Sequence, residues 1–228
     1  MAFALIALIV ILGLAVLPQW WVRSVLARNA RERTDLAGTG GEFARFLLDG
    51  MKLGDVTVEE SQIGDHYDPQ ARAVRLSKDH FNGRSLSAVV VAAHEVGHAM
   101  QDATGYGPLK ARTRLAAQAH RIQTVGFALM LAAPLLVLFL RSPALMFVEI
   151  GAGVLLLSVT VLMHVFTLPV EFDASFKRAL PLLEAGRFIP ESDMPAAREI
   201  LRAAAFTYVA AAAMSMLDVM RWLRVLRF

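Results

Sequence analysis

The chain of 228 residues contains no cysteine. Disulfide bonds and thiolate metal ligands are therefore excluded, and a metal ion can be held only by histidine, carboxylates or water. Charged residues are also scarce, because they make up 19% of the chain while apolar residues make up 56%. With a mean hydropathy of +0.50, this composition favours a small polar domain joined to membrane helices.

The basic residues are not gathered with aromatic ones. The net charge is +3 and the isoelectric point is near 9.6, but the arginines flank apolar runs, with Arg23 and Arg28 after the first and Arg121 before the second. Such arginines are typical of the cytoplasmic ends of membrane helices, whereas a nucleic-acid surface combines basic with aromatic side chains. We therefore expect the lipid bilayer as a partner and no nucleic acid.

The stretch His94-Glu-Val-Gly-His98 has the HExxH pattern of zinc metalloproteases. On a helix, residues four apart leave the same face, so His94 and His98 can hold one metal ion together. Glu95 then lies beside the metal, where a carboxylate can act as a general base toward water. A chance match on a buried helix would leave the cost of burying Glu95 unexplained. We expect one Zn²⁺ per chain.

Apolar runs divide the chain into four segments. Residues 1–21 predict an N-terminal membrane anchor, since about twenty apolar residues suffice to cross a bilayer. Residues 122–166 predict a transmembrane helical hairpin. Residues 22–121 predict a soluble segment on the cytoplasmic face that contains the HExxH helix. Residues 167–228 predict a third-ligand helix, with Pro169 in its first turn, followed by an apolar helix whose crossing stays open; all four segments form one catalytic unit.

The polar segment before the HExxH helix predicts a short helix and a small sheet. Thr39 and Glu42 have the spacing of a capping box ahead of an apolar stripe. Residues 55–59 and 72–77 alternate with period two, and Asp68-Pro69 marks a turn between them, which predicts a hairpin or small sheet. The edge of that sheet either receives an extended peptide by strand addition or is covered by the rest of the chain.

A catalytic zinc site needs a third protein ligand and one open position. The downstream candidates are His120, His164 and Glu171. Two membrane crossings between His98 and Glu171 would return Glu171 to the side of the membrane from which the HExxH helix starts. We therefore predict His94, His98 and Glu171 as the metal ligands. In the alternative interpretation, Glu171 only stabilises the N-terminus of its own helix.

Four further residues are candidates for supporting roles. Asp173 and Ser175 follow Glu171 and could hold a ligand imidazole through its free N–H, or could simply be solvated on the helix. Tyr208 and His66 are candidates for donating a hydrogen bond to the oxyanion of the reaction. A tyrosine on an apolar helix is more often a packed side chain.

Six stretches together resemble one family. They are His66-Tyr-Asp-Pro69, Val74-Arg-Leu-Ser77, Gly83-Arg-Ser85, Ala92-Ala-His-Glu-Val-Gly-His-Ala-Met-Gln101, Leu168-Pro-Val-Glu-Phe-Asp-Ala-Ser175 and Thr207-Tyr-Val-Ala-Ala211. They are similar to the YugP-like neutral zinc metallopeptidases of bacterial membranes, a gluzincin-like group, along nearly the whole chain. The resemblance implies His94, His98 and Glu171 as zinc ligands. Ser175 stands where the wider group has aspartate.

These observations predict a mostly α fold, with multi-pass membrane helices and a zincin-like metalloprotease core made of the HExxH helix plus a small β hairpin or sheet. The predicted function is that of an integral membrane zinc metalloendopeptidase. It would hydrolyse peptide bonds of a polypeptide or membrane-protein substrate with a zinc-activated water and Glu95 as general base. We expect a multi-pass protein of the bacterial inner membrane with its active site on the cytoplasmic side.

Two other functions stay open. The first is a non-catalytic zinc-binding membrane interaction or scaffold protein, in which protein groups close the fourth coordination position. The second is a transporter in which Glu149, His164 and Glu171 line a polar path. Each function is compatible with a membrane partner or a homo-oligomer.

Overall fold

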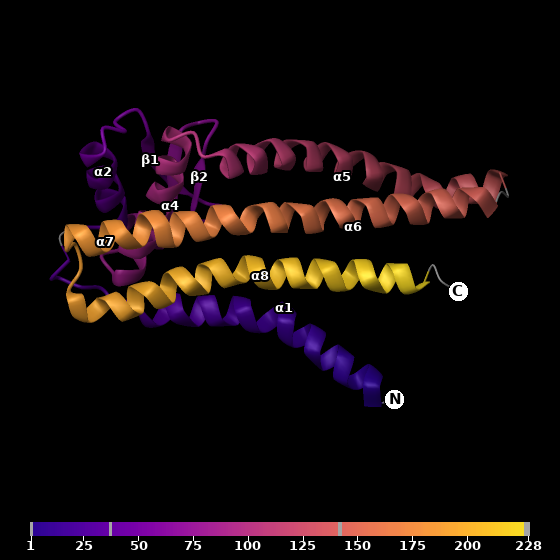
Figure 1. Cartoon of the computed structure of the whole chain (residues 1–228), viewed down its shortest axis with the longest axis horizontal. Coiled ribbons are helices and arrows are strands. Elements are labelled where there is room, and N and C mark those ends of the chain that lie inside the picture. The colour runs from indigo at the N-terminus through magenta and orange to yellow at the C-terminus, as the bar shows by residue number, and fades with distance from the viewer. Residues whose placement is uncertain (1, 37, 141–142, 226–228) are drawn as a thin grey trace.

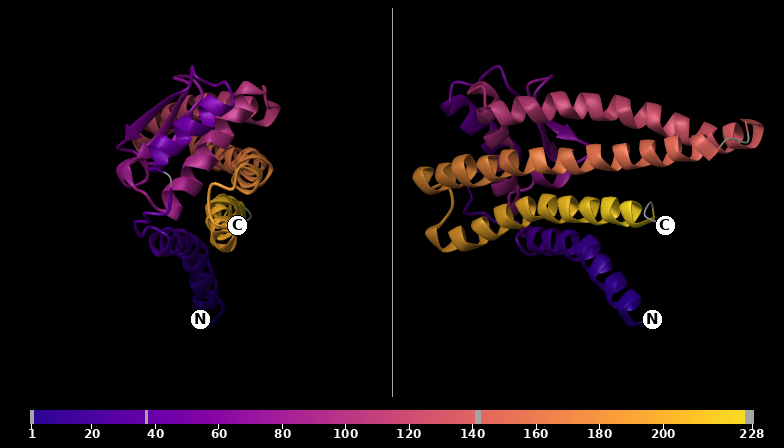
Figure 2. Two further views of the ribbon diagram at one scale, coloured as in Figure 1. Left: turned by 90° about the vertical axis from the view of Figure 1, so that its left-hand side faces the viewer. Right: turned by 45° about the vertical axis from the view of Figure 1, so that its right-hand side comes forward.

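Four long helices extend from one end of the molecule, where the short elements gather. The computed structural model describes residues 2–36, 38–140 and 143–225. The long helices are α1 (Ala2–Arg28), α5 (Gly107–Leu140), α6 (Pro143–Phe172) and α8 (Met194–Val225). α5 packs against α6, α6 against α8 and α8 against α1 (Figures 1 and 2). The described short elements are α2 (Gly40–Gly50), β1 (Thr57–Ser61), β2 (His66–Asp68), β3 (Ala73–Ser77), α3 (Lys78–Asn82), α4 (Leu86–Ala103), η1 (Asp173–Ala179), α7 (Leu180–Gly186) and η2 (Glu191–Asp193).

Helices α2 and α4 both begin after a residue whose side chain caps the helix. Before α2, the Thr39 side chain accepts a hydrogen bond from the backbone N–H of Glu42, and the Glu42 side chain accepts one from the backbone N–H of Thr39. This is the expected capping box. Before α4, the side chain of Ser85 accepts a hydrogen bond from the backbone N–H of Ala88. Both caps satisfy N–H groups that have no partner within the helix.

The expected small sheet forms, with one strand more than the sequence predicted. β1 and β3 are parallel neighbours, with Val58 opposite Val74, and β2 runs antiparallel to β3, with Tyr67 opposite Val74. The strand order is β1-β3-β2. The turn at Asp68-Pro69 joins β2 to β3, because the Asp68 carboxylate accepts hydrogen bonds from the backbone N–H groups of the next two non-proline residues. β2 was missed because three residues are too few to show a period.

The helix that carries Glu171 does not begin at Pro169. Pro169 lies inside α6, which continues directly into η1, a π-helix. At its end the backbone N–H of Leu180 donates to the carbonyl of Ser175, five residues back. π-helical turns are rare and occur often at functional sites. The second helix of the predicted transmembrane hairpin and the predicted third-ligand helix therefore form one continuous helical segment.

The membrane part of the predicted fold class is wrong. Across residues 2–36, 38–140 and 143–225, none of the helices combines the length with the apolar character that a bilayer crossing requires. The predicted runs belong to longer helices that also carry charge, such as Arg112, Arg114 and Arg121 on α5. The long helices also pack on one another. A mostly helical protein with a small three-stranded sheet remains.

Candidate metal centre

Helix α4 holds three of the predicted site residues inside the protein. His94, Glu95 and His98 are 8%, 6% and 5% exposed. The two histidine rings lie one turn apart, with centroids 4.7 Å from each other and planes at 80°. Glu171 on the last turn of α6 is 2% exposed and faces them. The fold therefore brings the two halves of the predicted ligand set to one buried place.

The donor atoms of this cluster converge. Nε2 of His94 lies 3.2 Å from Oε2 of Glu171, and Nε2 of His98 lies 3.5 Å from the same oxygen. One ligand atom from each of the three residues lies within 4.8 Å of the others. Two donors bound tetrahedrally to zinc at roughly 2.0–2.1 Å are about 3.3 Å apart. The three side chains thus fit a zinc ion in both donor type and spacing.

The other nitrogen of each histidine ring is already engaged. Nδ1 of His98 donates to Oε1 of Gln101 at 2.9 Å, because an amide oxygen can only accept. Nδ1 of His94 lies 3.1 Å from Oγ of Ser175. With Nδ1 of each ring engaged in this way, Nε2 is the nitrogen that faces Glu171 and is left to bind a metal ion. Ser175 occupies the position that its predicted supporting role requires.

Gln101 is a site residue that the sequence analysis missed. Its amide nitrogen donates to Oδ2 of Asp173 at 2.9 Å and to the carbonyl of Val170 at 2.8 Å, so its orientation is fully defined. Asp173 also accepts from Nε of Arg178 at 2.7 Å. Asp173 therefore contacts Gln101 and does not reach a ligand imidazole itself. The position of Gln101, three residues after His98 on the same helical face, was the available signal.

A glycine within the motif allows the two halves to meet. A Cβ atom on Gly97 would lie 2.8 Å from the carbonyl oxygen of Ala174 on η1. Because side-chain carbons do not approach a backbone oxygen this closely, only glycine permits the present spacing of α4 and η1. That spacing places Ser175 against His94 and Glu171 against both histidines.

Arg112 on α5 is a second residue that the sequence analysis missed at this site. Its Nη1 donates to Oε1 of Glu171 at 3.1 Å, so the two carboxylate oxygens have separate partners. Burial opposes ionisation of Glu171, but the charges and hydrogen bonds of His98 and His94 hold its pKa well below the usual range. Glu171 is therefore an anionic ligand candidate with a defined orientation.

Glu95 is buried next to the cluster without belonging to it. Burial raises the pKa of Glu95 to about 7; the charge of His94 opposes this shift, whereas that of Glu171 supports it. A carboxylate whose pKa is near neutrality both accepts and returns a proton easily. This property matches the predicted role of Glu95.

The remaining candidates have different positions. The negative charge of Glu171 and burial raise the pKa of Tyr208 on α8. His66 lies on β2, where its Nδ1 pairs with the carbonyl of Gly64 at 3.1 Å. Among the described residues, His164 is not part of the ligand group. The side chains of His120 and Glu149 lie outside the described part of the structure.

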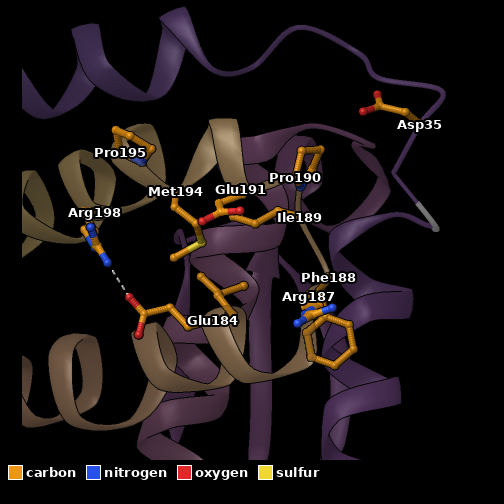
Figure 3. A pocket seen from close by; sticks show the side chains of 11 residues that line it. Asp35, Glu184, Arg187, Phe188, Ile189, Pro190, Glu191, Met194, Pro195 and Arg198 are labelled. Carbon is orange, nitrogen blue, oxygen red and sulfur yellow. Dashed lines mark hydrogen bonds and ion pairs between the residues drawn. The ribbon is translucent and has the colours of Figure 1, made fainter.

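A cavity of about 980 Å³ lies between α7 and the start of α8, away from the cluster of His94, His98 and Glu171. Figure 3 shows its lining of mixed charge, with Glu184 and Arg198 paired at 2.6 Å across one side. None of the clustered ligand residues or Glu95 lines it. Size alone therefore does not identify the reactive site, whereas the converging donors do.

Nearly the whole chain matches one known family. Residues 4–227 match the family described as "Putative neutral zinc metallopeptidase". The chain is also similar to the "Putative membrane protease YugP" of Bacillus subtilis (strain 168), with 40% identity over 218 residues that cover 94% of this chain and 92% of the relative. No solved structure matches the chain. These matches confirm the family resemblance seen in the sequence.

Proposed function

This chain belongs to the family of neutral zinc metallopeptidases, and on that premise we propose that it is a zinc-dependent endopeptidase. His94, His98 and Glu171 would hold one zinc ion, and Glu95 would act as the general base. One observation supports this most directly: both Nε2 atoms face the same oxygen of Glu171, while Glu95 is buried beside them and belongs to no ligand group.

The chain's own residues account for the proton movements. Zinc, when bound, supplies Lewis acidity, which makes water nucleophilic near neutral pH and polarises a peptide carbonyl. Glu95 takes the proton of the attacking water and passes it to the leaving amine. Tyr208 and His66 are the candidates for donating a hydrogen bond to the oxyanion. The known hydrogen bond of His66 is local, to Gly64.

Ser175, Gln101 and Asp173 keep the ligands in place. Ser175 and Gln101 each contact the Nδ1 atom of one histidine, and Asp173 fixes the amide of Gln101. Such partners determine which ring nitrogen is free and how the ring is oriented. A purely structural zinc site is the rival function, and it needs a fourth protein ligand. Among the described residues, this metal-binding group has three members, His94, His98 and Glu171.

We also propose that the protein works at a membrane on polypeptide substrates. The similar Bacillus protein is named a membrane protease. On the described surface, Leu17 and Trp20 of α1 are 62% and 64% exposed, and tryptophan is frequent at the interface between water and lipid. The cytoplasmic side of the active site stays a prediction. Fractionation of cells, with protease accessibility from either side, tests both points.

The decisive experiment compares Glu95→Gln with the wild-type chain. Zinc content should stay at one ion per chain in both, while cleavage of casein should be lost in the variant by at least about a hundredfold, the usual contribution of a general base. Glu184→Gln, on the distant surface, is the control. Equal cleavage by Glu95→Gln and the wild-type chain would remove Glu95 from the mechanism, and a wild-type chain without zinc would contradict the function itself.

A further inference from the structure

A small cavity adjoins the metal centre through Arg112. It has a volume of about 300 Å³ and lies between the first turns of α5 and the β2–β3 turn. Leu109, Ala116 and Pro69 give it small apolar walls. The guanidinium of Arg112, which lines the cavity, also contacts Glu171 at 3.1 Å. The cavity therefore reaches to within one side chain of the predicted zinc ligands.

The side chains of Tyr67 and Asp68, which also line the cavity, have partners within the protein. The hydroxyl of Tyr67 donates to Oδ2 of Asp102 at 2.8 Å. Oδ2 of Asp68 accepts from Arg75 at 2.6 Å, and its Oδ1 accepts from two backbone N–H groups. Arg112 differs from them, because it uses one of its five N–H donors on Glu171 and its side chain is 30% exposed. The remaining donors of Arg112 are available to a ligand.

The helix segment that carries Arg112 is positively charged. From Gly107 to Arg121, helix α5 carries Lys110, Arg112, Arg114 and Arg121 and no acidic residue. Of these basic residues, only Arg112 lines the cavity. The positive charge along this segment favours the approach of anionic groups, and Arg112 is the residue that can contact them in the cavity.

We propose that this cavity, here called the Arg112 pocket, binds a carboxylate of the peptide substrate. The group is either an acidic side chain close to the cleaved bond or the C-terminal carboxylate of the substrate. A guanidinium with free donors forms paired, charge-assisted hydrogen bonds with a carboxylate, and the apolar walls suit the carbon atoms that precede it. This inference rests on the proposed peptidase function and specifies its substrate preference.

The test measures peptide binding to the full chain carrying Glu95→Gln, so that the peptides stay intact. Three probes are compared by calorimetry: acetyl-Ala-Ala-Glu-Ala-Ala-amide, the same peptide with glutamine, and the glutamine peptide with a free C-terminal carboxylate. We expect at least one carboxylate peptide to bind about tenfold more tightly than the uncharged glutamine amide. A preference for the first identifies an acidic side chain as the source, and a preference for the third identifies the chain terminus. Equal affinities overturn the proposal.

Variants show whether the preference depends on the pocket. Arg112→Gln should abolish the preference, whereas Arg114→Gln, an exposed arginine on the same helix that does not line the pocket, should retain it. Arg112→Gln could also disturb Glu171, so Ala116→Phe provides a second test: it fills the pocket without removing the contact between Arg112 and Glu171. We expect Ala116→Phe to weaken binding of the preferred peptide about tenfold while zinc content is unchanged. Unchanged binding by Ala116→Phe contradicts the pocket.

The outcome of the peptide-binding test does not depend on catalysis. If casein is not cleaved but the preference and its dependence on Arg112 are observed, the binding site stands and the peptidase function fails. If casein is cleaved by the wild-type chain without any preference among the three peptides, the peptidase function stands and the Arg112 pocket fails as a carboxylate site.

Discussion

The side chain of Gln101 connects His98 to Asp173: its oxygen accepts from Nδ1 of His98 at 2.9 Å and its nitrogen donates to Oδ2 of Asp173 at 2.9 Å. The two hydrogen bonds cross the boundary between α4 and η1, elements far apart in the sequence. An amide in this position can do what a carboxylate or a carbonyl does in other zinc sites, since it fixes the ring nitrogen that carries the proton.

Replacing Gln101 by leucine should weaken zinc binding. Leucine has a similar size but cannot accept a hydrogen bond from Nδ1 of His98. It also removes the hydrogen bond that Gln101 donates to Asp173. We expect a loss of about 10- to 100-fold in zinc affinity, the range found for partners of metal ligands. Competition with a coloured zinc chelator measures this loss. Gln62→Leu, on an exposed loop, is the control, and equal affinity of the two variants would show that Gln101 does not position the ligand.

Glu171→Gln should lower the zinc content of the purified protein. The amide keeps the shape of the side chain but removes the negative charge that Arg112 and both histidines face. Elemental analysis should find about one zinc ion per wild-type chain and much less in the variant, because neutral oxygens are weak zinc ligands compared with carboxylates. Glu184→Gln should keep the wild-type content. Full zinc occupancy in Glu171→Gln would contradict the predicted ligand set.

Gly97→Ala should destabilise the protein. Its methyl group would meet the carbonyl oxygen of Ala174 at 2.8 Å, so α4 and η1 would have to separate. We expect a decrease of about 1–3 kcal/mol in the free energy of unfolding, as for other overpacked sites. Gly50→Ala is the matched control, since a Cβ there meets nothing within 4 Å. Thermal unfolding followed by circular dichroism measures both, and a shift for Gly97→Ala no larger than that for Gly50→Ala would show that the contact is not tight.

Asp65 should contribute stability that is lost in acid. Burial opposes its ionisation, but the hydrogen bonds and charge of His80 and the hydrogen bonds of Ser77 lower its pKa below the usual value. A carboxyl whose pKa is lower in the folded protein stabilises it above the unfolded pKa of about 3.9, and this contribution disappears as pH falls through the folded pKa. Asp65→Asn should therefore be less stable than the wild-type chain at pH 6.

The free energies of unfolding of the wild-type chain and of Asp65→Asn should converge as the pH falls below about 4, because protonation of Asp65 removes the difference between them. The measurement is chemical unfolding of zinc-free protein across pH, so that metal release does not contribute. Asp79→Asn, on the exposed side of α3, is the control. A difference between Asp65→Asn and the wild-type chain that stays constant with pH would show that ionisation of Asp65 is not its source.

Local patterns were sufficient wherever neighbouring residues along the chain interact. The capping box at Thr39 is confirmed, because it depends on residues within one helical turn. The pairing of His94 with His98 on one helical face follows from their spacing alone. Glu171 was chosen from an expected pair of membrane crossings, which the structure does not support, and from the family resemblance; the structure brings it to both histidines.

Local sequence patterns did not predict the contacts between segments that are distant along the chain. Nothing near Arg112 in the chain indicates that it meets Glu171, and the parallel pairing of β1 with β3 depends on how α2, α3 and α4 pack around them. The membrane crossings were wrongly predicted for the same reason, since hydropathy describes a single run and not the helices that lie against it. The amino-acid sequence thus specified the helices and the chemical groups of the metal centre. Tertiary packing decided which of these groups meet, because contacts such as Arg112–Glu171 and His94–Ser175 join residues about sixty to eighty positions apart.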